Sequence, residues 1–427
     1  MVDQGTLVAT APTADSAAPV GHGTPTGVAG LRTWAALKGR SFRLYWGSSM
    51  AHMGAMNVQQ MVQPWFMYEI TQSSTMLGYT ALASAIPMML FSPVGGYFAD
   101  RFAKKNLLFV GQLLCLLVAL ALGAGIAAGL VTAPIILGTA VLQGLLMSLM
   151  MPARQAMVVE IVEREHLSNA LALNNAGMNV NRMMIPAAAG LLVAFAGAAS
   201  GYFAIAALYA VALVMTAQLE KRPPTAGREG FISQMRAGLT YVRGDRTIAV
   251  LLLVTLGGVA LSMPYMTLLP VFTKDVLHVG PDQLGYLMAL SGGGALVTSL
   301  IIASMRDRNR GLWYLGYMAL LGGGLVGLAV IHSYWLALLF IIPVGVGQAG
   351  RMAFSNILVQ SYVEDAYRGR VMSIFLMEFG LTSLSTFGFS IVAEYAGIAW
   401  ALGITGGLLV LFTAAIYWFV PRLTRLH

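Results

Sequence analysis

The sequence GYFADRFAKK at residues 96–105 separates two long apolar runs and places four charged residues between them. The runs cover roughly 76–99 and 106–129, and each holds about the 20 mostly apolar residues that a helix needs to cross a bilayer. A short, basic connection between two such runs is typical of a loop on the cytoplasmic side of a membrane. This stretch therefore predicts two membrane-spanning helices joined by a cytoplasmic loop.

The rest of the chain repeats this alternation. Of its 427 residues, 58% are hydrophobic and 10% are charged, whereas a soluble domain carries about 25% charged residues. We predict an all-α polytopic membrane protein with twelve spans, at roughly 43–69, 76–99, 106–129, 132–157, 169–196, 200–219, 247–273, 282–304, 311–331, 334–358, 371–395 and 399–420.

The basic residues set the predicted orientation. With the N-terminus in the cytoplasm, 22 of the 25 Lys and Arg residues fall on the inner side of the membrane. The positive-inside rule then places both termini in the cytoplasm and the protein in the cytoplasmic (inner) membrane. It also explains the net charge of +8 without a nucleic-acid partner.

Two segments of the chain resemble each other at a nearly constant offset. Asp100-Arg101 and Asp307-Arg308 lie 207 positions apart, as do Leu77-Gly78-Tyr79 and Leu284-Gly285-Tyr286. We therefore predict two six-helix halves related as a parallel repeat, with substrate bound between them. The predicted organisation is a disordered tail (1–40), a first half (41–219), a cytoplasmic linker with an amphipathic helix (220–246), a second half (247–420) and a short tail (421–427).

The loop at 96–105 resembles the loop 2–3 signature of the major facilitator superfamily, G-x-x-x-D-R-x-G-R-[RK], with Ala103 at its second Gly and Lys104 at the Arg that follows. Pro152-Ala153-Arg154-Gln155-Ala156 and Arg368-Gly369-Arg370-Val371-Met372-Ser373 resemble the enterobactin and macrolide exporter branch. The resemblance covers about residues 40–420. It implies a secondary transporter that works by alternating access.

Four residues of the two loop copies are candidate gating residues: Asp100, Arg101, Asp307 and Arg308. An acid at a cytoplasmic helix end can face the positive N-terminus of another helix, and such a contact contributes about 0.3–2 kcal/mol. The resemblance implies this role for Asp100, and Arg101 could pair with Glu160 or Glu163. The alternative is a charge cluster that only sets topology.

Ionisable residues inside predicted spans are expensive and usually mark a pathway or an ion pair. The candidates for coupling are Glu378, Arg351, Arg182 and His52. A carboxyl in apolar surroundings can carry a proton near neutral pH, which makes Glu378 the leading candidate. Glu378 could instead form a buried pair with Arg351, Arg182 could bond only to neighbouring helices, and His52 could be a packing residue.

Polar and polarizable side chains on predicted helix faces are candidates for lining a substrate cavity. They are Gln59, Gln63, Gln143, Met147, Asn179, Tyr265, Met266 and Gln348. His52, Gln59 and Gln63 form one stripe that we expect to face the central cavity. The chain has 26 Met, which suit surfaces that adapt to varied ligands, although ordinary helix packing explains many of them. The pattern favours an apolar, amphipathic or cationic substrate.

The motifs for other functions are missing from the sequence. There is no G-x-x-x-x-G-K-[ST] for ATP, no G-x-S-x-G and no paired His motif, so we predict neither an enzyme nor a bound cofactor or metal. Our prediction is a monomeric, proton-coupled exporter of small apolar or amphipathic compounds, drug-like or siderophore-like. The alternatives are an importer, a lipid transporter or a membrane sensor that transports nothing.

Overall fold

The computed structural model describes residue 37 and residues 39–162, 166–221, 240–305, 309–363 and 378–420. Within these ranges every regular element is a helix, so the all-α polytopic fold class is confirmed. Parts of the prediction lie outside the described residues: most of the two tails, most of the linker helix, Asp307 and Arg308.

The first half of the chain forms five long helical segments. They are α1 (Arg40–Thr71), α2 (Ser74–Arg101), α3 (Lys104–Ala127), α4 (Ala133–Ile161) and α5 (Leu167–Ala217). The α5 segment is two helices in sequence, because Gly197 breaks it with φ 75° and ψ 173°. A positive φ favours glycine, which has no Cβ to clash with its own backbone.

The second half forms eight labelled elements. They are α7 (Arg246–Ser262), α8 (Pro264–Val271), the π-helix η3 (Phe272–Val276), α9 (Pro281–Ser304), α10 (Arg310–Ala329), α11 (Tyr334–Tyr362), α13 (Glu378–Ala396) and α14 (Ile398–Phe419). The elements α7, α8 and η3 make one pass, with the helix interrupted just before Pro264 because proline cannot donate the next backbone bond.

The described helices make twelve passes when α5 is divided at Gly197 and α7, α8 and η3 are counted together. Their ends lie within a few residues of the predicted spans wherever the structure describes them. In the described residues, nine candidate spans satisfy length and apolarity criteria, and one of these, Asn169–Ala217, covers both helices of α5.

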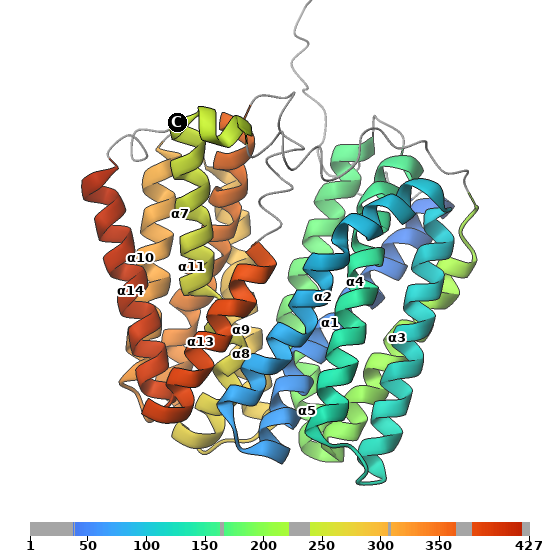
Figure 1. The fold of residues 1–427 in the computed structure, drawn as a ribbon, viewed down its shortest axis with the longest axis horizontal. Helices are drawn as coiled ribbons and strands as arrows, with labels where there is room; N and C mark the ends of the chain where they lie inside the picture. Colours follow the sequence, from blue (N-terminus) through green and yellow to red (C-terminus); the bar gives the residue numbers. More distant parts are fainter. Residues whose placement is uncertain are drawn as a thin grey trace, which may run out of the picture.

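The passes form two helix groups that lie side by side (Figure 1). The groups meet where α2 packs on α13 and where α5 packs on α9. Both contacts use a glycine of the repeated Leu-Gly-Tyr sequence. A Cβ at Gly78 would lie 2.1 Å from Ser390 Oγ, and one at Gly285 would lie 2.5 Å from the Pro186 carbonyl oxygen. The repeat thus encodes two close helix crossings between the groups.

Polar contacts join the two groups at the end that carries the α1–α2 and η3–α9 turns, the lower end in Figure 1. The Tyr68 hydroxyl donates to the Asp275 carboxylate, which links α1 to η3. The Glu394 carboxylate of α13 accepts from Ser73 Oγ at 3.1 Å and from the Thr75 backbone N–H at 3.2 Å. We call this the joined end of the molecule.

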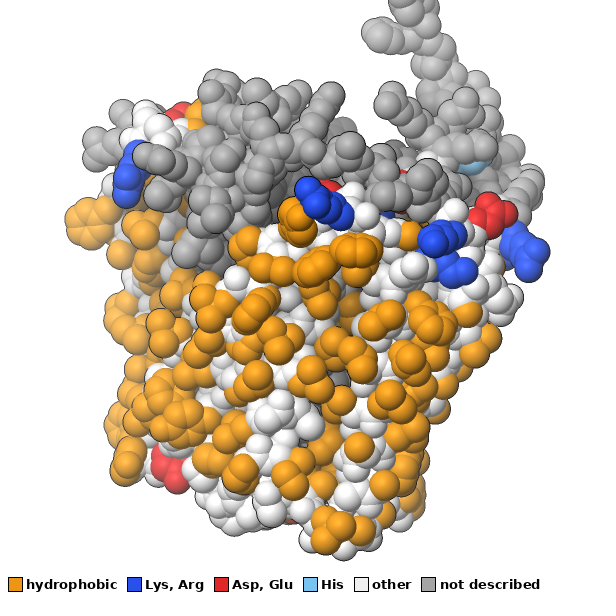
Figure 2. Space-filling view, turned by 45° about the vertical axis from the view of Figure 1, so that its right-hand side comes forward, with side chains coloured by type: hydrophobic (Ala, Val, Ile, Leu, Met, Phe, Trp, Pro, Cys, Tyr) orange, Lys and Arg blue, Asp and Glu red, His pale blue; other side chains and the backbone are white. Residues whose placement is uncertain are grey.

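The surface matches a protein immersed in lipid. Apolar side chains cover the visible flank, and the Lys and Arg side chains of that face lie along its upper edge (Figure 2). Large side chains such as Phe195, Trp335 and Trp418 are more than three-quarters exposed, which a bilayer would cover. The chain is an integral membrane protein.

Candidate transport pathway

A methionine-lined pocket lies where the two helix groups meet. Met88 and Met89 of α2, Met147 and Met151 of α4 and Phe379 of α13 contribute to its wall, which encloses about 80 Å³. Met147 is a predicted cavity residue. The other three methionines were missed, because the sequence alone does not show that their helices converge here. Methionine side chains are flexible and polarizable, so such a wall can adapt to apolar ligands.

Glu378 begins α13 as described, next to Phe379 of the methionine pocket. It faces the positive field of Arg351 on α11, but no oxygen of Glu378 lies within 4.0 Å of an Arg351 nitrogen. Arg351 is only 1% exposed, and its Nε and Nη2 atoms have no hydrogen-bond partner among the described residues. The two residues are therefore electrostatic neighbours and do not form a closed ion pair.

Tyr265 lies between two arginines. It follows Pro264 at the start of α8, it is buried, and its hydroxyl interacts with Ser291 of α9. Arg351 and Arg182 both act electrostatically on this hydroxyl. Arg182 belongs to α5 in the other helix group, and its exposed side chain makes no hydrogen bond or ion pair with any residue that the structure describes. The structure thus brings together three residues that the sequence singled out separately.

Three further predicted cavity residues occupy the same two helix groups. Gln348 of α11 donates from Nε2 to the Met263 sulfur at 3.0 Å, while its buried Oε1 has no partner in the described ranges. Met266 and Asn179 are both half-buried. Asn179 shares a helix face with Arg182, and that face packs against α9, because a Cβ at Gly292 would lie 2.6 Å from the Arg182 carbonyl oxygen.

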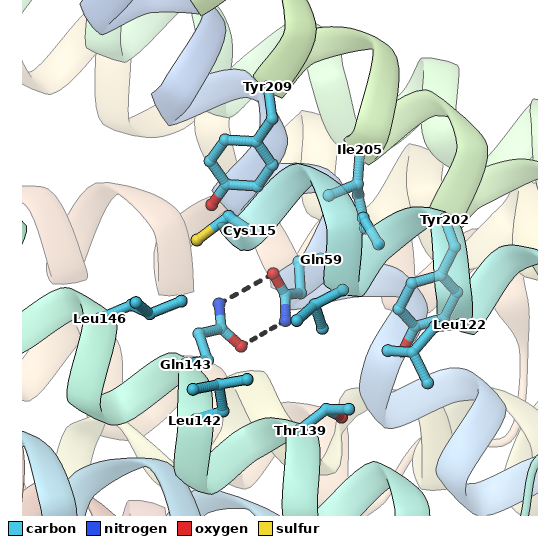
Figure 3. A pocket seen from close by; sticks show the side chains of 12 residues that line it. Gln59, Cys115, Leu122, Thr139, Leu142, Gln143, Leu146, Tyr202, Ile205 and Tyr209 are labelled. Atoms are coloured by element: carbon cyan, nitrogen blue, oxygen red, sulfur yellow. Dashed lines mark hydrogen bonds between the residues drawn. The ribbon is translucent and has the colours of Figure 1, made fainter. Parts of the chain in front are cut away.

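Three of the four predicted glutamines bond to one another. Gln143 Nε2 donates to Gln59 Oε1 at 2.8 Å, and Gln59 Nε2 donates both to the Gln143 oxygen and to Gln63 Oε1, the latter at 3.1 Å. Figure 3 shows the Gln59–Gln143 pair in a cavity of about 20 Å³ inside the first helix group, bordered by Tyr202, Tyr209 and Cys115. That volume has room for about one water.

His52 is buried inside the first helix group, as the alternative of a packing residue predicts. It is 2% exposed and packs edge-on against the Tyr209 ring, with centroids 5.6 Å apart. It lies in the positive field of Arg154, which is 8% exposed and donates from Nη1 to Ser49 Oγ at 2.9 Å. The sequence pattern places Arg154 among the inner-side charges. Helix α4 continues for almost two turns beyond it, to Ile161.

The candidate gate lies at the opposite end from the joined end. Asp100 and Arg101 end α2 and are exposed, and the Arg101 guanidinium stacks on the Tyr97 ring at 4.7 Å. Glu160 pairs with Lys104 at 2.5 Å and not with Arg101, because Lys104 starts α3 beside the end of α4. Glu163 and residues 364–377, which include the helix start expected to face Asp100, lie outside the described residues.

Comparison with known proteins settles the family. Residues 31–425 match the family model described as "Transmembrane secretion effector", which spans nearly the whole chain. The chain belongs to this branch of the major facilitator superfamily. The transporter is 25% identical to the staphyloferrin A transporter of Staphylococcus aureus over 90% of this chain and 96% of that protein. It is also 25% identical to the multidrug efflux pump Tap of Mycobacterium tuberculosis, covering 79% of this chain and 83% of the pump.

Solved transporter structures share the fold. The nucleoside transporter NupG superimposes with a TM-score of 0.72 at 13% identity, over 88% of this chain and 98% of that one. A POT family peptide transporter in complex with sulfate gives 0.71 at 13% identity, over 91% and 96% of the two chains. At this identity the likeness concerns the fold alone, and these neighbours, like the sequence relatives, are transporters.

Proposed function

We propose that this transporter exports small apolar or amphipathic compounds across the cytoplasmic membrane, in exchange for protons, by alternating access. The observation that carries the proposal is the methionine-lined pocket at the junction of the two helix groups, with Glu378 beside it. A pocket between two repeated halves is where such transporters bind substrate. The match to a secretion effector family and the likeness to an efflux pump favour outward transport.

The joined end supports an inward-facing arrangement. Under the positive-inside rule the end with Arg101 and Lys104 is cytoplasmic, both termini are cytoplasmic, and the joined end is external. The Tyr68–Asp275 and Ser73–Glu394 contacts then close the outer side, which leaves the pocket to load from the cytoplasm. These contacts break when the halves rock outward. We propose a monomer as the working unit, since one chain supplies both halves.

Glu378 is the proposed proton carrier. It is half-buried and lies next to the substrate pocket. The positive charge of Arg351 acts on its carboxylate without an ion-pair contact. The guanidinium of Arg351 favours the charged form of this carboxylate, whereas less polar surroundings favour the protonated form. A movement of the helices that changes these surroundings can therefore make Glu378 bind or release a proton. Proton binding and substrate release are thereby linked through the start of α13.

Asp100 is the proposed cytoplasmic gate residue, with Asp307 as its counterpart in the second half. An acid at the end of α2 can be stabilised by a helix N-terminus of the other half when the inner side closes. Asp100→Asn is expected to insert normally and to transport more slowly, which comparison of membrane yield with transport rate would measure. Normal transport by this variant would remove the gate role.

The direct test of export is an accumulation screen. Cells that express the protein and cells with an empty vector are exposed to a panel of apolar and amphipathic fluorescent dyes, with and without a protonophore. The proposal predicts lower accumulation of at least one dye on expression, and loss of that difference when the proton gradient collapses. Higher accumulation would indicate import, and a difference that survives the protonophore would exclude proton coupling. Lower accumulation of no dye in the panel would contradict export of this compound class.

A further inference from the structure

The centre of the transporter carries more positive than negative charge. Among the described residues between the two helix groups, Arg182 and Arg351 supply two guanidinium groups and Glu378 supplies one carboxylate. None of the three forms an ion pair within 4.0 Å in the part of the chain that the structure describes. An unpaired charge at membrane depth is costly, so its persistence indicates that a partner binds there at some stage.

The two arginines reach one site from opposite helix groups. The Arg182 backbone contacts Gly292 of α9, and the residue before that glycine, Ser291, interacts with the Tyr265 hydroxyl. Ser291 also packs directly on α11, where a Cβ at Gly345 would lie 2.1 Å from its carbonyl oxygen. Gly345, Gln348 and Arg351 recur every three residues on α11 and so share roughly one face. Tyr265 and Ser291 therefore lie in the layer that joins Arg182 to Arg351.

The donors in this layer have unused hydrogen-bonding capacity. Arg351 is 1% exposed, yet its Nε and Nη2 atoms have no acceptor within the described helices. Arg182 is exposed, so a compound in the pathway can reach its guanidinium. Guanidinium groups bind carboxylates and other oxyanions through two parallel hydrogen bonds, which makes an anion the natural partner for this site.

Resting on the proposed function, we propose that the exported compound carries a carboxylate or a similar oxyanion, which Arg182 binds while Tyr265 and Arg351 supply further positive potential. The apolar part of the compound then lies in the methionine-lined pocket. Such a site selects amphipathic anions. An apolar cavity without the arginines would suit cations as well. The charge of Arg182 is the discriminating feature, because Arg182 is exposed to the compound whereas Arg351 is buried beside Glu378.

The test uses matched probes that differ only in charge. Purified protein in nanodiscs of zwitterionic lipid is titrated with naphthyl and longer arylalkyl carboxylic acids and with the methyl ester of each, and thermal stabilisation is measured. At least one acid is expected to bind roughly ten- to a hundredfold more tightly than its ester. Arg182→Gln should abolish this preference and Arg182→Lys should retain part of it. Arg43→Gln, which removes an exposed charge of α1, should leave the preference intact.

The outcomes separate this inference from the proposed function. Equal stabilisation by every acid and ester pair, or none by any, overturns the anion site, as does a preference that survives in Arg182→Gln. Stabilisation only by an anionic lipid added to the discs would assign the arginines to a lipid headgroup and equally overturn it. The accumulation screen does not depend on these results, so export can hold while the anion site fails.

Discussion

Each half of the transporter buries an arginine on its fourth helix, but the two arginines have different surroundings. Arg154 of α4 donates to Ser49 at 2.9 Å, and Gln112, in the amide orientation that satisfies both its ends, accepts from Nη2 at 3.2 Å. Arg351 of α11 is more deeply buried, and two of its nitrogens, Nε and Nη2, have no partner among the residues described, against one, Nε, for Arg154. Both arginines interact with two tyrosines, and Tyr314 hydrogen-bonds to Arg351. Only Arg351 also has a carboxylate nearby, that of Glu378.

This difference separates a structural charge from a functional one. A buried arginine held by neutral hydrogen-bond acceptors stabilises one arrangement of helices, because its removal leaves those acceptors unpaired. A buried arginine with more unused donors and a nearby carboxylate contributes less to stability and remains available to a partner that comes and goes. We therefore assign Arg154 to the rigid first half and Arg351 to the cycle of proton and substrate binding.

The strongest test of this comparison is Arg351→Met. Without the guanidinium, Glu378 loses the cation that stabilises its charged form, so transport is expected to fall at least tenfold. Thermal stability should stay the same or rise, since replacing an unsatisfied buried charge by an apolar side chain is often neutral or stabilising by about 1–4 kcal/mol. Dye efflux and a melting curve on the same preparation measure both. A lower melting temperature with normal efflux would reverse the assignment.

The matched change in the first half is Arg154→Met. It removes one hydrogen bond each from the Ser49 hydroxyl and the Gln112 amide and is expected to cost about 1–3 kcal/mol of stability. The melting temperature should fall, which a melting curve measures. Unchanged stability together with lost transport would move Arg154 from the rigid first half into the transport cycle.

The smallest expected effect concerns the Gln59–Gln143 pair, which also belongs to the rigid half. Gln59→Leu leaves the half-buried Gln143 amide without its glutamine partner, Gln143→Leu leaves Gln59 bonded to Gln63 alone, and the double change removes both members of the pair. A double-mutant cycle on melting stability should give a coupling of roughly 1 kcal/mol, with near-normal transport in the double variant. A double variant that folds but no longer transports would move the glutamines into the substrate pathway.

The sequence predicts the helices well, because an apolar run between short polar or charged connections is a local signal. It places Glu378, Arg351, Arg182 and Tyr265 on the correct helices for the same reason. It does not predict which side chains meet: Glu160 pairs with Lys104, and His52 packs on Tyr209. Those contacts depend on how helices rotate and cross, which no single segment of sequence records.

Arg154 is a second residue whose surroundings the sequence does not predict. It lies near the inner end of the predicted span 132–157, so a count of charges assigns it to the inner surface. Helix α4 continues to Ile161, and the acceptors that hold the guanidinium come from α1 and α3. A buried charge can be recognised only when those partners are known.

Glu378 carries the coupled proton in the proposed transport cycle. Proteoliposomes with wild-type protein, Glu378→Gln or Glu69→Gln are loaded with the dye that the accumulation screen identifies, and a pH gradient is imposed. Glu69 is an exposed acid of α1 at the joined end and serves as the matched control. We predict gradient-driven transport by the wild type and Glu69→Gln, and its loss in Glu378→Gln with dye binding retained. Undiminished gradient-driven transport by Glu378→Gln would contradict the proton-carrier role.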